Sequence, residues 1–193
     1  MPSLSEESRI AILEFTRQGV LQAVCHDRPF SVFPTTGVFG ERRGLFVTLH
    51  VAKKLRGCIG IIEAQATLGE TLARCAADAA LRDPRFSRIH LQEMDELEIE
   101  VSLLSPLRPI RAEEVEIGTH GLLVERGTRR GLLLPQVAVE HRLTREQFLA
   151  EACRKAGLPR EAWKDPETKL HGFQCEVIAE SRGEHAEKQD PRQ

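Results

Sequence analysis

The sequence contains no tyrosine, a single tryptophan and no long apolar run. No segment approaches the ~20 apolar residues that cross a bilayer, so we expect no membrane-spanning helix. Hydrophobic residues make up 41% of the 193 positions and charged residues 29%, which is ordinary for a soluble globular protein. The net charge of −2 and the lack of a basic and aromatic surface pattern argue against nucleic acid as a partner.

Paired cysteines and closely spaced histidines are also missing. The cysteines are odd in number, widely separated and without a CxxC pair: Cys25, Cys58, Cys75, Cys153 and Cys175. This pattern supports neither a zinc knuckle nor a dithiol redox motif, and it favours a reducing, cytoplasmic location. There is no HxxxH or HExxH spacing, no phosphate loop and no dinucleotide fingerprint, and the first residues lack the features of a secretory signal. We therefore expect no metal site and no cofactor.

The hydrophobic pattern predicts an α+β fold. Strands joined by hairpins imply antiparallel pairing, so we expect a mainly antiparallel sheet flanked by helices. The expected order is a helix at 5–24, a hairpin at 37–51 turning at 40–44, a helix at 67–81, a strand at 97–103, a hairpin at 121–134 turning at 127–131, a helix at 144–156 and a strand at 173–177. Residues 180–193 are charged and almost devoid of large apolar side chains, so they are expected to form a disordered tail.

Local signals refine the three helices. Thr67 is expected to cap the second helix, and Thr144 with Gln147 to form a capping box at the start of the third. Gly157 stands where a C-terminal cap belongs. In the first helix, helical spacing predicts a core-facing stripe of apolar residues: Ile10, Leu13, Val20, Leu21 and Val24.

Residues 55–60, with the sequence LRGCIG, form the most unusual segment. Gly57 and Gly60 flank Cys58, and two glycines in four residues weaken a strand and usually mark a bulge or a close backbone approach. They leave the thiol little shielding from its own neighbours, and Arg56 would favour the reactive thiolate. The segment is interpreted as a reactive loop, or as a place where the backbone meets a ligand.

This segment resembles the hallmark motif of the AMMECR-type domain, called protein A of the AmmeMemoRadiSam system in prokaryotes. Further matches occur in the order of the family: FVTL at 46–49, DPRF at 83–86, EVSL at 100–103, GTHGL at 118–122, LPQV at 134–137, and KAGL at 155–158 followed by Trp163. The resemblance covers residues 5 to 178. It implies one α+β domain over residues 1–179, with a larger and a smaller lobe. It also implies a radical S-adenosylmethionine (SAM) protein and a Memo-like protein as partners.

Cys58 is the leading candidate for a catalytic nucleophile. A nucleophilic thiol needs a base within hydrogen-bond reach, and His120 is the candidate for that base. Glu100 lies on the polar side of the 97–103 strand and could act as a base or pair with Arg85. The alternative is that Cys58 is a small buried residue at a tight strand crossing and that Glu100 belongs to a solvated sheet face.

The remaining candidates would bind rather than react. Arg85 follows the second helix and can bind a carboxylate or phosphate through its planar guanidinium, or form a structural pair with Asp83. Gln136 can hydrogen-bond a ligand or the Cys58 segment, or instead bond to backbone as a turn amide. The full set of expected binding residues is Arg56, Gly57, Gly60, Asp83, Arg85, Ser102 and Gln136.

Two functions therefore stay open. In the first, the protein is a cysteine-dependent enzyme that works beside the radical SAM and Memo-like proteins. In the second, it is a non-catalytic module that holds a small molecule, a peptide or a modified substrate and presents it to the radical enzyme. In both, we expect residues 55–60 to line the main cleft, near Arg85, Glu100 and His120.

Overall fold

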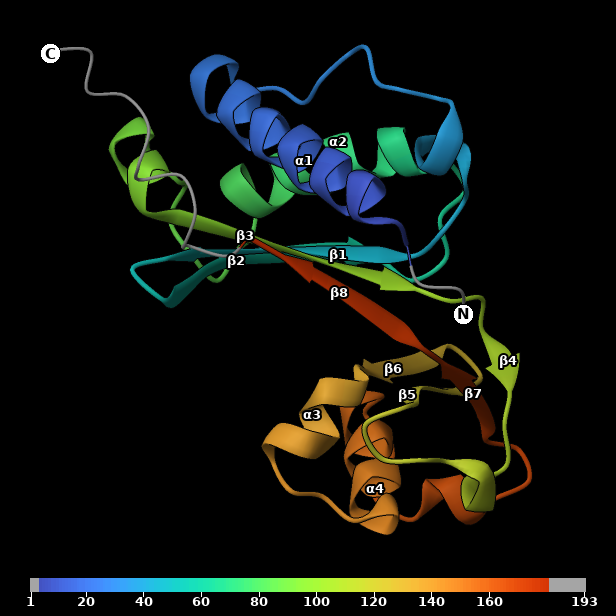
Figure 1. The fold of residues 1–193 in the computed structure, drawn as a ribbon. Helices are drawn as coiled ribbons and strands as arrows, with labels where there is room; N and C mark the ends of the chain where they lie inside the picture. The colour runs from blue at the N-terminus through green and yellow to red at the C-terminus, as the bar shows by residue number, and fades with distance from the viewer. Residues whose placement is uncertain (1–3, 181–193) are drawn as a thin grey trace, which may run out of the picture. The chain divides into compact units, whose positions relative to one another are not determined.

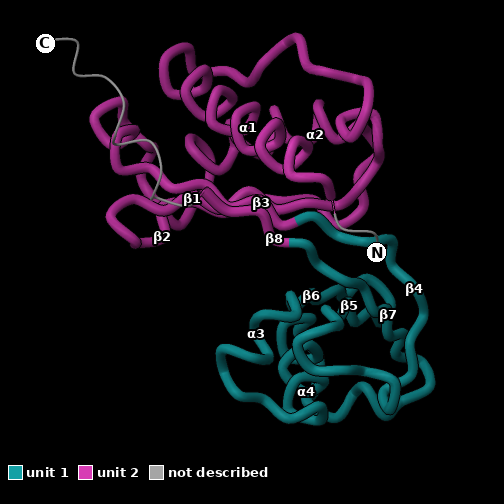
Figure 2. Tube along the Cα trace, in the orientation of Figure 1, with its two compact units in different colours: residues 1–3, 103–176 teal, residues 4–102, 177–193 magenta. Residues whose placement is uncertain are grey.

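Two four-stranded antiparallel sheets organise the chain in the computed structural model, which describes residues 4–180 (Figure 1). The described chain divides into two compact units (Figure 2). Unit 1 comprises residues 103–176, and unit 2 comprises residues 4–102 together with 177–180. Strands β3 (Leu97–Leu104) and β8 (Cys175–Ala179) contain the points at which the chain passes from one unit to the other. The predicted α+β class with antiparallel sheets is confirmed.

Unit 2 is a sheet with two helices on one face (Figure 1). Its strand order is β2-β1-β3-β8. Leu45, Val47 and Leu49 alternate along β1 and are completely buried, so they form the side of the sheet that packs on the helices. The remaining elements of this unit are α1 (Glu6–His26), η1 (Gly37–Gly40), β1 (Leu45–Val51), β2 (Lys54–Ile61), α2 (Leu68–Leu81) and η2 (Leu91–Glu96).

The buried face of α1 differs from the predicted one. Ile10 and Leu21, placed in the expected apolar stripe, are 48% and 42% exposed. The helix instead buries a stripe that includes small and hydroxyl-bearing residues: Ile12, Thr16, Gly19, Val20 and Ala23. Gly19 lies so close to α2 that an added Cβ would come within 3.3 Å of the Ala76 Cβ. The two helices meet through small side chains, so the predicted stripe, chosen from large apolar residues, shares only Val20 with the fully buried residues of α1.

The first hairpin also lies elsewhere than expected. Residues 37–40 form the 3₁₀ helix η1, and the hairpin joins β1 to β2 through Ala52 and Lys53. Both turn residues have positive φ, 48° and 62°, as in a type I′ turn. Such turns usually contain glycine or asparagine, so the sequence offered no turn signal here, whereas the glycines at 40 and 44 offered a false one.

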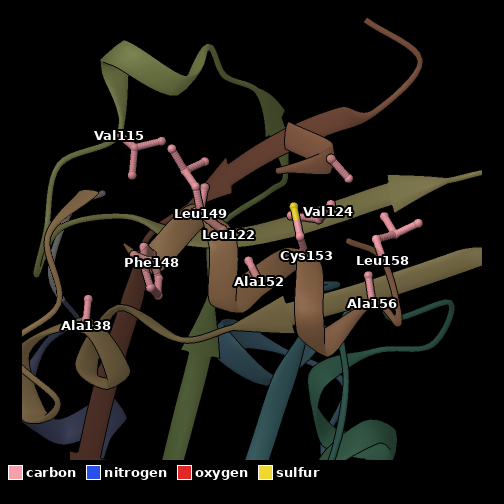
Figure 3. Close-up of a cluster of buried hydrophobic side chains, with 11 residues drawn as sticks. Val115, Leu122, Val124, Ala138, Phe148, Leu149, Ala152, Cys153, Ala156 and Leu158 are labelled. Carbon is pink, nitrogen blue, oxygen red and sulfur yellow. The ribbon is translucent and has the colours of Figure 1, made fainter. Parts of the chain in front are cut away.

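Unit 1 is a smaller sheet packed on α4. Its strand order is β4-β7-β5-β6, and the predicted β5–β6 hairpin is confirmed, with a tight turn at Gly127 and Thr128. The core joins the sheet to α4 through a cluster that includes Leu122, Val124 and Phe148 (Figure 3). The elements are β4 (Arg108–Pro109), η3 (Ala112–Glu114), β5 (Gly121–Arg126), β6 (Arg129–Leu133), α3 (Pro135–Glu140), α4 (Arg145–Lys155), η4 (Ala162–Lys164) and β7 (Lys169–Phe173).

The predicted helix caps are found. Thr67 accepts a hydrogen bond from the Glu70 N–H at the start of α2. At α4 the capping box is complete, since Thr144 accepts from the Gln147 N–H and the Gln147 side chain accepts from the Thr144 N–H. Gly157 follows α4 with φ +70°, a left-handed conformation that glycine adopts without strain.

The last predicted strand is in fact two strands in different sheets. β7 ends at Phe173 and pairs with β5, whereas β8 begins at Cys175 and joins the sheet of unit 2. Between them, Gln174 exchanges hydrogen bonds with Ser105. Side-chain alternation continues through the junction, so periodicity alone cannot show that the backbone changes its pairing partner.

Glu180, the first residue of the expected tail, is anchored to the fold. Its carboxylate accepts two hydrogen bonds from the Arg17 guanidinium, at 2.7 and 2.6 Å, and its N–H donates to the Ile99 carbonyl. The rest of the expected tail, residues 181–193, lies outside the described residues. Within residues 4–180, no helix combines the length and the apolar character needed to cross a membrane.

Candidate functional site around Cys58

Cys58 lies in β2, the edge strand of the unit 2 sheet, and not in a loop. It pairs with Thr48 of β1, whose hydroxyl donates to the Cys58 Sγ at 3.4 Å. The next pair along, Gly57 with Leu49, packs on α2. Because side chains alternate along a strand, Cys58 and Thr48 lie on the opposite face of the sheet. The prediction of a reactive loop is therefore wrong in its secondary structure, and the thiol is half-buried on that face.

At this sheet edge the backbone N–H and carbonyl of Cys58 are hydrogen-bonded to side chains of the Asp83–Arg85 turn. The Cys58 N–H donates to Asp83 Oδ2 at 2.9 Å, and Arg85 donates to the Cys58 carbonyl at 3.2 Å. An edge strand without such partners exposes free donors and acceptors to other chains. At Cys58 the DPRF turn thus supplies, through the Asp83 carboxylate and the Arg85 guanidinium, the two backbone bonds that a further strand would make.

Asp83 and Arg85 also form a tight ion pair with each other. Arg85 donates to both carboxylate oxygens, at 2.9 and 2.6 Å, and its own N–H adds a third bond. The Asp83 side chain is 2% exposed, and the Arg85 side chain is 56% exposed. The Arg85 guanidinium, helped by the Cys58 N–H, holds the pKa of Asp83 far below its ordinary value despite burial. Arg85 therefore forms the structural pair with Asp83 that the sequence analysis gave as an alternative.

Arg56 is directed at a loop and not at the thiol. It is the extra residue of a β-bulge, because Leu49 pairs with Gly57 while the next residue pairs with Leu55. Its guanidinium donates to both carboxylate oxygens of Glu93 and to the carbonyls of residues 87 and 88. Arg56 lowers the pKa of Glu93, and it ties the segment between α2 and β3 to the sheet.

The two glycines are required by packing. An added Cβ at Gly57 would lie 2.0 Å from the Ala79 carbonyl oxygen of α2, and one at Gly60 would lie 2.2 Å from the Phe46 ring. A Cβ atom cannot stand at either distance unless the neighbouring atoms move. The expected bulge and the expected close backbone approach are both present, and the partner in each approach is the protein itself.

Glu100 and Ser102 lie where their alternation placed them. Leu97, Ile99 and Val101 of β3 are buried, so Glu100 and Ser102 belong to the opposite face, the one that carries Cys58. Glu100 is half-buried and Ser102 is 1% exposed. Within unit 2 the sheet therefore gathers a thiol, two hydroxyls and a carboxylate on one face.

His120 and Gln136 belong to unit 1. His120 Nδ1 accepts a hydrogen bond from the Glu116 N–H, which closes the turn before β5. Gln136 lies at the start of α3, a helix that the sequence analysis did not predict, and its amide faces the Cys175 Sγ at 3.9 Å. Their expected roles beside Cys58 stay predictions.

Sequence reasoning missed a hollow in unit 1. It has a volume of about 460 Å³ and lies between α3 and α4. The available signal was the polar spacing of Gln147, Glu151 and Lys155, which places these residues on one side of α4. No group of three metal-ligating side chains is found within residues 4–180.

The fold and the site define an α+β protein whose cysteine-bearing edge strand is held by an Asp-Pro-Arg-Phe turn. The chain belongs to the AMMECR1 family, whose model matches residues 13–178. It is 45% identical over 162 residues to Protein MJ0810 of Methanocaldococcus jannaschii, covering 78% of this chain and 81% of that protein. A protein of Methanothermobacter thermautotrophicus is 45% identical over 150 residues, covering 74% of this chain and 78% of its own length.

A solved structure matches the fold as well. It is the crystal structure of uncharacterized protein PH0010 from Pyrococcus horikoshii, which is 35% identical and superposes with a TM-score of 0.83. The match covers 92% of this chain and 94% of that one.

Proposed function

We propose that this protein is a non-catalytic binding module that works with a radical SAM protein and a Memo-like protein. The observation that carries the proposal is the engagement of the charged groups around Cys58. Arg56 is bound to Glu93 and two carbonyls, and Arg85 is bound to Asp83 and the Cys58 carbonyl. Arg56 serves the framework, and Arg85, which also interacts with the Cys58 side chain, has its charge paired with the Asp83 carboxylate.

The face that carries Cys58 suits recognition of a polar ligand. Thr48 offers a hydroxyl oxygen that can accept a hydrogen bond while its proton is donated to Cys58, and the Cys58 thiol can itself act as a weak donor. The strands that carry them are fixed by the core and by the Asp83 turn, so these groups are held in place before a ligand arrives. A small polar molecule or a peptide segment with several hydrogen-bonding groups is the class of ligand that this face would hold for the partner enzyme.

A cysteine-dependent enzyme is the second candidate. It is favoured by the half-buried thiol, which shares its face with Glu100, a group able to move protons. In that case Cys58 would form a covalent intermediate, with His120 or Glu100 as base.

Alkylation of the thiols by iodoacetamide separates the two candidates. A binding module predicts that Cys58 reacts no faster at pH 6 than the exposed Cys25. Cys75 serves as the unreactive control, since burial raises its pKa to about 12. Modification of Cys58 at least about tenfold faster than Cys25 at pH 6 would instead indicate an activated nucleophile.

Reconstitution with the two partner proteins tests the rest of the proposal. The wild-type chain and its Cys58→Ser variant should form the same complex in analytical ultracentrifugation and should support partner turnover equally. Absence of any complex with the wild-type chain would refute the partnership. A Cys58→Ser complex that assembles but yields no product would establish catalysis at the thiol.

A further inference from the structure

The hollow between α3 and α4 has an apolar floor. Leu133, Val137 and Leu143 line it and are partly buried against the core of unit 1. The side of α4 that builds that core carries Phe148, Ala152 and other small or apolar residues (Figure 3). The hollow therefore opens beside the core, on a neighbouring side of the same helix. A volume of about 460 Å³ lies within the range of small-molecule sites.

The rim of the hollow is cationic. Its lining includes three cationic side chains and a histidine: Arg154, Lys155, Arg160 and His141. Among the described lining residues, Glu151 carries the only carboxylate. This excess of positive charge stands out in a chain whose net charge is −2. An apolar floor under a cationic rim is complementary to a molecule with an apolar body and an anionic head.

Glu151 pairs with both arginines and competes with a ligand for them. It accepts from Arg154 Nε at 2.6 Å and lies 3.0 Å from an Arg160 nitrogen, and Arg154 lowers the pKa of Glu151. A guanidinium has five N–H donors, and the Arg154 and Arg160 side chains are 70% and 63% exposed. Further donors of both groups therefore face solvent and are able to bind an incoming carboxylate or phosphate.

We propose that this hollow binds an organic anion in which a carboxylate or phosphate head is joined to an apolar body. The body packs on Leu133, Val137 and Leu143, and the head bonds to Arg154 and Arg160. The site lies wholly within unit 1 and does not depend on the function proposed for the Cys58 face.

Octanoate and octyl phosphate are suitable probes, with octan-1-ol and octylammonium as controls of the same chain length. Binding is measured by isothermal titration calorimetry and located by amide chemical shifts in α3 and α4. Octanoate, octyl phosphate or both should bind at least about tenfold more tightly than the alcohol. The tighter of the two identifies the head group. Equal affinity for octanoate, octan-1-ol and octylammonium would overturn the proposal. So would the absence of binding of either anion at about 10 mM, which is roughly ten times the upper end of ordinary KM values.

Two nearly isosteric changes, one turn apart on α4, should act in opposite directions. Gln147→Glu adds a negative charge at the rim while keeping the capping box, so it should weaken octanoate binding about threefold. Glu151→Gln removes the competing carboxylate and should strengthen binding by a similar factor. If both changes act in the same direction, the assignment of the head to Arg154 and Arg160 is wrong.

Removal of one cation completes the test. Arg160→Ala should weaken octanoate binding about fivefold, whereas Arg74→Ala, at an arginine 59% exposed on α2 of unit 2, should leave it unchanged. Thermal unfolding of each variant shows that it is folded. Cys58→Ser should bind octanoate like the wild type, so the octanoate-binding result is independent of the function proposed for the Cys58 face. Equal loss in Arg160→Ala and Arg74→Ala would refute a specific site.

Discussion

The carboxylate of Asp83 accepts a hydrogen bond from the backbone N–H of Cys58 at 2.9 Å, which joins two segments 25 residues apart. The same carboxylate forms the ion pair with Arg85, and Arg85 returns to the Cys58 carbonyl. The two most distinctive motifs of the sequence, LRGCIG and DPRF, are therefore two halves of one structural device. Their joint purpose in the fold is to complete and protect the edge of the unit 2 sheet.

Removal of the Asp83 charge should destabilise the protein. Asp83→Asn leaves Arg85 without its ion partner beside a buried amide, and it should lower the free energy of unfolding by about 2–4 kcal/mol. Asp78→Asn is the matched control, because Asp78 pairs with Arg82 on an exposed part of α2 and should cost less than about 1 kcal/mol. Urea denaturation measures both, and equal effects would contradict the structural role of Asp83.

Acid should remove the contribution of Asp83. Its pKa is lowered on folding, so the unfolded chain binds the proton more readily, and the stabilisation is fully present above the unfolded value of about 3.9. It is lost as the pH falls below that value towards the lower folded pKa. The difference in unfolding free energy between the wild type and Asp83→Asn should therefore shrink below about pH 4. A difference that stays constant from pH 6 to pH 2.5 would rule out this linkage.

Replacement of Arg56 should loosen the segment that leads into β3. Arg56→Lys keeps the charge but cannot reproduce two bonds to Glu93 and two to backbone carbonyls. Amide hydrogen exchange of residues 87–93 should accelerate at least about tenfold, corresponding to ~1.4 kcal/mol. The amides of α4 serve as the internal reference. Glu93→Gln should give the same pattern, and the double variant should add little, since both changes break one interaction.

In residues 55–60, Gly57 should be essential to the fold and the Cys58 thiol should not. Gly57→Ala forces a Cβ against the Ala79 carbonyl oxygen, a backbone atom that cannot rotate away, and should cost about 3 kcal/mol or more. Cys58→Ala keeps the backbone bonds to Asp83 and Arg85 and should cost about 1 kcal/mol. Thermal unfolding ranks the stabilities of the two variants. A less stable Cys58→Ala would show that the Cys58 side chain stabilises the fold through contacts other than these.

The Arg17–Glu180 pair should couple the end of the described chain to α1. Arg17 also donates to the Leu97 carbonyl, and Glu180 also accepts from the Ile99 N–H. A double-mutant cycle with Arg17→Met and Glu180→Gln should give a coupling free energy of about 1 kcal/mol. Additive effects of the two changes would show that the ion pair contributes nothing to stability.

Much of the local structure could be predicted because its causes are local. Thr144 and Gln147 are three residues apart and satisfy each other's backbone groups, so the start of α4 was readable from the sequence. The alternation along β3 placed Glu100 and Ser102 on the correct face for the same reason. The β1–β2 turn could not be predicted from local signals, because Ala52 and Lys53 adopt left-handed conformations that only the surrounding sheet imposes.

The sequence by itself determined the family, the α+β class and the importance of residues 55–60. Only the tertiary structure decided what those residues do. Arg56 meets Glu93, and Cys58 meets Asp83, across separations of 37 and 25 residues, and such partners depend on how the sheet, α2 and the intervening loop pack together. Spacing along the chain reports which face a side chain occupies, but not which distant group will neutralise its charge.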